Sequence, residues 1–195
     1  MKNQEIATEN DSWFKNLQTE AEKIGARLHL IPKLVVDYTK SYREAVIAGS
    51  GGTQTEFNSN VLSIGSKYGL PDENKVIEET IILFSLQECH GYSAFLKVVE
   101  WGLSNDLLQT TPHVPFTIGE QKPNLNHEFG ENPTWVFETT GAFASREICY
   151  VCWLNNYRSS ECDCFDYGGV WFAFRKKIVS SPLPERTTAE FFDGC

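Results

Sequence analysis

The sequence predicts an α+β fold in a single domain, with a mixed or antiparallel sheet, several short helices on it and a C-terminal antiparallel meander. Three observations lead to this prediction. The length of 195 residues fits one domain with its own core. Helical periodicity alternates with apolar, strand-like runs as far as residue 133. From residue 134 onward, short β-type runs are separated by turn residues.

Residues 1–26 predict an N-terminal amphipathic helix. Its apolar face is formed by residues at helical spacing, namely Trp13, Leu17, Ala21 and Ile24. The polar residues 10–12 are N-cap candidates, and Gly25 should end the helix. We expect residues 27–179 to form the α+β domain.

Residues 27–38 predict a strand near an edge of the sheet. Pro32 has no N–H to donate to a ladder, so it should bulge or break this strand. A second helix is expected after Ser41, because Ser41 and Glu44 have the spacing of a capping box. Gly49 should end that helix.

Residues 77–86 predict the central strand of the sheet. The run 81–84 is apolar on both strand faces, which is typical of a strand covered by helices on both sides. A helix is expected from Ser93 to Gly102 and a short one from Thr111 to Gly119, since each range begins and ends with capping residues. Residues 126–133 predict a loop.

The last third of the chain predicts the antiparallel meander. Its strand-like runs lie at residues 135–137, 148–154, 162–167 and 170–175. They are separated by pairs typical of turns, namely Asn155-Asn156, Ser159-Ser160 and Gly168-Gly169. Residues 180–195 are polar and contain two prolines, so we expect a tail outside the main core.

Charge and hydropathy bear on partners and location. The net charge is −9, and residues 120–166 hold eight Asp and Glu against three Arg and Lys. This balance would repel phosphates, so it disfavours direct nucleic-acid binding. It suits either solubility alone or a basic surface on a protein partner. No stretch has the pattern of a secretory signal or a membrane span, so we expect a cytoplasmic protein without membrane contact.

Four cysteines have a spacing that invites a metal-site interpretation. They follow the pattern C-x2-C-x9-C-x-C, at Cys149, Cys152, Cys162 and Cys164, and close thiolate pairs are ligands that zinc selects. Strand-forming residues separate Cys149 from Cys152, however, and residues three apart on a strand point to opposite faces. The alternative of small buried thiols is therefore preferred, and no cofactor is expected.

A second chemical hypothesis is a small hydrolase or transferase. Cys89 and His90 follow the predicted central strand, where α/β proteins often place active groups, and His113 or His127 could serve as the base. Adjacent side chains rarely point at one another, and no family-specific catalytic motif occurs. Catalysis is therefore the less favoured class.

The C-terminal aromatic and arginine residues are the candidates for a recognition surface. The proposed binding residues are Trp153, Tyr157, Arg158, Trp171 and Arg175, residue types enriched in binding hot spots. Both faces of residues 170–174 are apolar, which favours a core role for much of this set. Arg158 is expected in a turn between strands, where it would be exposed.

Five segments occur in an order that points to known proteins: Tyr42–Ala48, Ile81–Leu86, Trp101–Leu103, Phe116–Leu125 and Phe172–Lys176. Over residues 31–176 the chain resembles a group of small uncharacterised bacterial and phage-borne proteins. That group has no established activity. The similar proteins generally lack cysteines at the four positions above, which further disfavours the zinc hypothesis.

The sequence thus favours a non-catalytic protein-interaction module with an acidic, aromatic surface. An inhibitor or modulator of a host macromolecule, carried by a mobile element such as a phage, is a concrete form of this hypothesis. A Cys/His-dependent enzyme and a zinc-stabilised binding module are the alternatives. The identity of the partner and the oligomeric state are left open.

Overall fold

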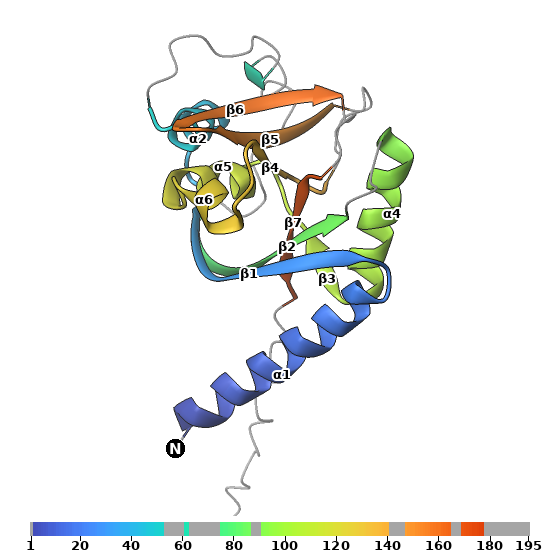
Figure 1. Cartoon of the computed structure of the whole chain (residues 1–195). Helices are drawn as coiled ribbons and strands as arrows, with labels where there is room; N and C mark the ends of the chain where they lie inside the picture. Colours follow the sequence, from blue (N-terminus) through green and yellow to red (C-terminus); the bar gives the residue numbers. More distant parts are fainter. Residues whose placement is uncertain are drawn as a thin grey trace, which may run out of the picture.

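Within the described residues, seven strands form one open sheet with helices on both faces (Figure 1). The computed structural model describes residues 2–52, 61–62, 75–86, 91–140, 147–164 and 169–177. The helices are α1 (Lys2–Glu22), α2 (Tyr42–Gly49), α4 (Gly91–Ser104), α5 (His113–Gln121) and α6 (Leu125–Phe129). The strands are β1 (Ala26–Asp37), β2 (Val76–Leu86), β3 (Leu107–Gln109), β4 (Thr134–Phe137), β5 (Glu147–Leu154), β6 (Tyr157–Cys164) and β7 (Trp171–Lys176).

The strand order is β1-β2-β7-β4-β5-β6, and β3 also pairs with β7. The pairs are antiparallel except for β4 with β7, which is parallel. Strands β4, β5 and β6 are consecutive antiparallel neighbours. The predicted α+β class, the mixed sheet and the C-terminal meander are therefore confirmed. Among the residues that the structure describes, no helix has both the length and the apolar composition needed to cross a membrane.

Strand β7 is central in the sheet, whereas β2, the strand predicted to be central, lies next to the edge strand β1. Strand β7 pairs with β2 along one side, while β3 and β4 share its other side. Trp171 and Ala173 belong to the core on one face of the sheet, and Phe172 and Phe174 belong to the core on the other. These four residues are all buried, as expected for a strand covered on both faces.

The two faces of the sheet are covered by different helices. On the Trp171 face, α2, α5 and α6 contribute Val46, Phe116 and Leu125 to the core. On the opposite face, α1 and α4 contribute Leu17 and Phe95. Burial of apolar side chains stabilises both layers, at roughly 1.5–3 kcal/mol for each large side chain fully buried.

Two local predictions agree with the structure. Strand β1 lies at an edge of the sheet, and its register with β2 shifts between Ile31 and Leu34, around Pro32. Helix α2 begins at the predicted capping box, in which Glu44 N donates to Ser41 Oγ and Ser41 N donates to Glu44 Oε2. Both features depend on short stretches of sequence.

Two predicted helix ends are wrong. Helix α1 begins at Lys2, so residues 10–12 lie inside it and do not cap it. Helix α4 continues through Gly102 to Ser104. A glycine fits at position 102 inside the helix because α4 packs closely on the sheet. A Cβ at this position would overlap the ring of Phe174.

Two predicted loop or turn segments are regular structure. Helix α6 occupies much of the predicted loop, and it ends at Gly130, whose φ of 65° is left-handed. Strand β6 begins at Tyr157 and includes Ser159 and Ser160, which were expected to form a turn. Ser160 Oγ donates to Val46 O at 2.9 Å, so a contact with α2 satisfies this buried hydroxyl.

The close approach of α4 to β7 predicts the effect of Gly102→Ala. Alanine favours a helix interior over glycine by about 1 kcal/mol, but the new methyl would meet the Phe174 ring. We expect urea denaturation to show a net loss of about 1–3 kcal/mol in the free energy of unfolding. In a Phe174→Leu background the same change should cost much less, and an equal cost in both backgrounds would contradict this account.

Candidate functional site

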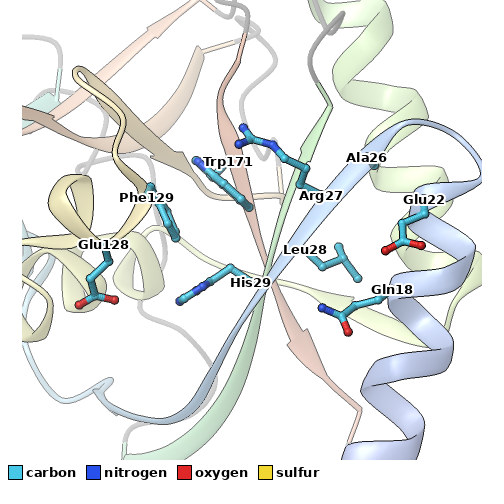
Figure 2. Close-up of a pocket in the computed structure, with 9 residues that line it drawn as sticks. All are labelled: Gln18, Glu22, Ala26, Arg27, Leu28, His29, Glu128, Phe129 and Trp171. Carbon is cyan, nitrogen blue, oxygen red and sulfur yellow. The ribbon is translucent and has the colours of Figure 1, made fainter.

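A pocket of about 420 Å³ lies over strand β1, between α1 and α6 (Figure 2). It is lined by Gln18, Glu22, Ala26, Arg27, Leu28, His29, Glu128, Phe129 and Trp171. Figure 2 shows His29, Phe129 and Trp171 on one side of β1, and Leu28, Gln18 and Glu22 on the other. The pocket is therefore a groove that follows the edge of the sheet on both of its faces. We call it the β1 groove.

One wall of the β1 groove is aromatic. Phe129 of α6 stacks on Trp171 of β7, with ring centroids 4.4 Å apart and planes at 25°. The His29 ring meets Phe129 edge-on at 4.8 Å. Trp171 is only 4% exposed, so the wall is continuous with the core and its side chains are already ordered.

The ion pair between Arg27 and Glu131 holds Trp171, one side chain of this wall, in place. Arg27 Nη2 lies 2.7 Å from Glu131 Oε1, and Trp171 Nε1 donates to Glu131 Oε2 at 2.9 Å. The Arg27 guanidinium also lies over the Trp171 ring, 5.0 Å from its centroid. Glu131 thus neutralises the one cation of the groove lining and satisfies the indole N–H.

The remaining charge of the β1 groove is negative. Glu22 and Glu128 are exposed and, within the described part of the chain, neither forms an ion pair with a lysine or arginine. Burial lowers the pKa of His29; the nearby Glu128 carboxylate opposes this effect in part, and the Lys122 ammonium adds to it. His29 is therefore neutral at pH 7, and one acidic side chain lies on each side of β1: Glu128 beside the aromatic wall and Glu22 on α1 (Figure 2).

The structure distributes the five predicted binding residues over different places. Trp171 lines the β1 groove. Trp153 is buried, with Nε1 donating to Lys122 O, whereas Tyr157 is 51% exposed beside the β5–β6 turn. Arg175 lines a separate cavity. These side chains do not form one surface.

Arg158 lies within β6 and not in a turn, which corrects the prediction for this residue. Its Nε donates to Gly49 O at 2.6 Å, at the end of α2. Burial lowers the pKa of the Arg158 guanidinium. Its contact with the helix terminus makes it a structural link between β6 and α2.

The cavity that contains Arg175 has a volume of about 320 Å³. Arg175 Nη1 lies 3.2 Å from Glu79 Oε1, and Tyr38 OH donates to Glu79 Oε2 at 3.2 Å. Lys75, Lys176 and Lys177 also line it. Its polar centre is an internally paired carboxylate.

The cysteines of the proposed metal site lie on both faces of the hairpin. Cys149 and Cys162 are opposite one another on β5 and β6 and share the core of the Trp171 face, while Cys152 packs on the other face. Cys149 and Cys152 cannot bind one ion without a rearrangement of β5. Burial raises the pKa of Cys149 well above its ordinary value, and raises that of Cys152 to about 12, so both are neutral thiols at pH 7. Cys164 is the last residue of β6.

The structure describes two of the three histidines proposed as catalytic bases. His113 is buried, its Nε2 is 3.1 Å from Lys40 O, and burial lowers its pKa. His127 is exposed on α6. Cys89 and His90 lie outside the described residues, so the proposed cysteine–histidine pairing stays a prediction.

Sequence reasoning missed most of the β1 groove. The sequence places Arg27 and His29 only in an edge strand, and it predicts a loop for residues 126–133. The available signal was Gly130, which follows Phe129 as a left-handed helix C-cap does. It would have placed Glu128 and Phe129 on a helix, but not beside β1.

Comparisons of the chain with protein-family models, with curated proteins and with solved structures find no match.

The lowered pKa values of His29 and His113 predict a pH-dependent stability. Their ordinary value is 6.5, so below about pH 6.5 the unfolded chain binds protons that the folded chain does not. Their contribution to stability is present above pH 6.5 and is lost as the pH falls toward the folded-state pKa values. Urea denaturation between about pH 7.5 and pH 5 should show a shallower decline for the His29→Gln, His113→Gln double variant than for the wild type. The same slope in both proteins would count against the assignment.

Proposed function

We propose that the protein is a non-catalytic interaction module that binds a partner protein through the β1 groove. The observation that carries the proposal is the pairing of an ordered aromatic wall, Phe129 on Trp171, with two carboxylates that have no basic partner in the described structure, Glu22 and Glu128. Aromatic side chains next to polar rims are the usual composition of protein recognition sites.

The chemistry of the β1 groove favours a basic side chain on the partner. Arg27 is already neutralised by Glu131, so a second cation near Glu22 or Glu128 meets a net negative field. Each exposed pair would contribute about 0.2–1 kcal/mol. Apolar contact with Phe129 and the stem of the basic side chain adds to this without a large ordering cost, because the wall is rigid.

The proposal refines the acidic, aromatic surface expected from the sequence. Of the residues expected to form that surface, only Trp171 lines the β1 groove; the acidic groups come from α1 and α6. An inhibitor or modulator of a host macromolecule, carried by a mobile element, is a form of this function in which the bound partner is the target.

A random-peptide display library provides a direct test. Peptides of about 12 residues selected on the protein should be enriched in lysine and arginine, and their binding should weaken as salt rises from about 50 to 500 mM. The Glu22→Gln, Glu128→Gln double variant should raise their Kd about tenfold, measured by fluorescence anisotropy.

The matched control is Glu100→Gln with Asp106→Asn, which removes the same charge from exposed positions outside the groove lining. It should leave the Kd within about twofold. Selection of peptides with no basic residues, or equal weakening by both double variants, would argue against the β1 groove as the binding site.

A further inference from the structure

The outer edge of β1 is closed over only part of its length. Beyond the bulge at Pro32, the side-chain amide of Gln121 pairs with the backbone of Val35: Gln121 Nε2 donates to Val35 O at 2.7 Å, and Val35 N donates to Gln121 Oε1 at 3.3 Å. Gln121 thus occupies the position that a neighbouring strand would take. Before the bulge, in the described residues, β1 pairs with β2 alone.

The alternation of the β1–β2 ladder identifies the outward backbone groups of the first half. The Gln121 bonds show that Val35 N–H and C=O point away from β2. The next pair along the ladder, Leu34 with Glu79, is therefore a hydrogen-bonded pair. On β2, the backbone N–H and C=O groups of Glu79 and of every second residue after it point toward β1. Their hydrogen-bonded partners on β1 are Leu34, Ile31, His29 and Arg27. It follows that Leu28 and Leu30 present their N–H and C=O groups to the outside.

The outward N–H and C=O groups of Leu28 and Leu30 lie along the β1 groove. The side chains of β1 alternate between its two sides, with His29 toward Phe129 and Leu28 toward α1 (Figure 2). An extended chain laid along this edge would therefore place alternate side chains against the aromatic wall and against Gln18 and Glu22 of α1.

We propose that the first half of β1 binds an extended segment of a partner protein as an additional strand, and that this segment carries a lysine or arginine. This inference rests on the proposed function and specifies its binding mode. Backbone hydrogen bonds to Leu28 and Leu30 give affinity. The basic side chain is selected by Glu128 if it points toward the aromatic wall and by Glu22 if it points toward α1. Pro32 and Gln121 set the length of the site, because they leave only residues 26–31 open.

Charge argues for a separate partner protein as the occupant. Residues 178–195 of this chain contain Glu185, Glu190 and Asp193 against Arg186, a balance of −2, which the negative groove would repel. A second copy, paired edge to edge by a two-fold axis, would bring two negatively charged grooves together. A basic segment from another protein meets neither penalty.

The test uses an acetylated and amidated peptide of about seven residues, with alternating threonine and valine and one central lysine. Two further versions carry N-methyl groups on one or the other set of alternate amides. Strand addition requires one set alone, so one version should lose about tenfold or more in affinity and the other should bind within about threefold of the parent. A groove that contacts only the side chains of the peptide would bind the two N-methylated versions with similar affinity.

Amide hydrogen exchange locates the added strand. At saturating parent peptide, exchange at Leu28 and Leu30 should slow about tenfold or more, whereas Val35, already bonded to Gln121, serves as the internal control. The Glu22→Gln, Glu128→Gln variant should bind the peptide more weakly, and a peptide with glutamate in place of lysine should bind the wild-type protein at least about tenfold more weakly than the parent.

The outcomes separate the two proposals. If charge-dependent peptide binding occurs but both N-methylated versions bind alike and Leu28 and Leu30 stay unprotected, strand addition is wrong and the β1 groove function stands. If no basic peptide binds, in this set or in the display library, both fail. Slow exchange at Leu28 and Leu30 without peptide, with a doubled mass in solution, would identify a second copy as the occupant and overturn this inference.

Discussion

The structure depends on one constraint, the burial of β7 on both faces while it bonds to strands from three other parts of the chain. Trp171 and Ala173 fill one core and Phe172 and Phe174 the other, and the ladder partners β2, β3 and β4 all precede β7 in the sequence. The sheet therefore cannot be completed until residues 171–176 join it. Such non-local pairing is entropically costly to form and makes the finished sheet cooperative.

Trp171 connects this core to the β1 groove. It is buried in the sheet, yet one part of it lines the groove, where Phe129 stacks on it and Arg27 covers it. Glu131 fixes the arrangement through the indole and the guanidinium. Packing of the groove wall against the core restrains its side chains, which reduces the ordering cost of binding.

The two halves of β1 show how an exposed sheet edge can be divided. Open edges invite uncontrolled pairing, and proteins commonly close them with prolines, bulges or side chains. Here Pro32, the register shift and the Gln121 amide close the second half. The first half lies between α1 and α6, whose side chains restrict what can approach and whose carboxylates set its charge. The edge is thus selective where it is open.

The sequence by itself determined the features that depend on a few neighbouring residues: the α+β class, the bulge at Pro32, the capping box at Ser41 and the meander. These follow from backbone preferences and local hydrogen bonds. Only the tertiary structure decided that Gly102 lies within a helix, that β7 is central, and that Phe129 meets Trp171 beside β1. The β1 groove combines side chains from α1, β1, α6 and β7, and no local pattern specifies which distant segments lie side by side, because that is set by packing of the whole core.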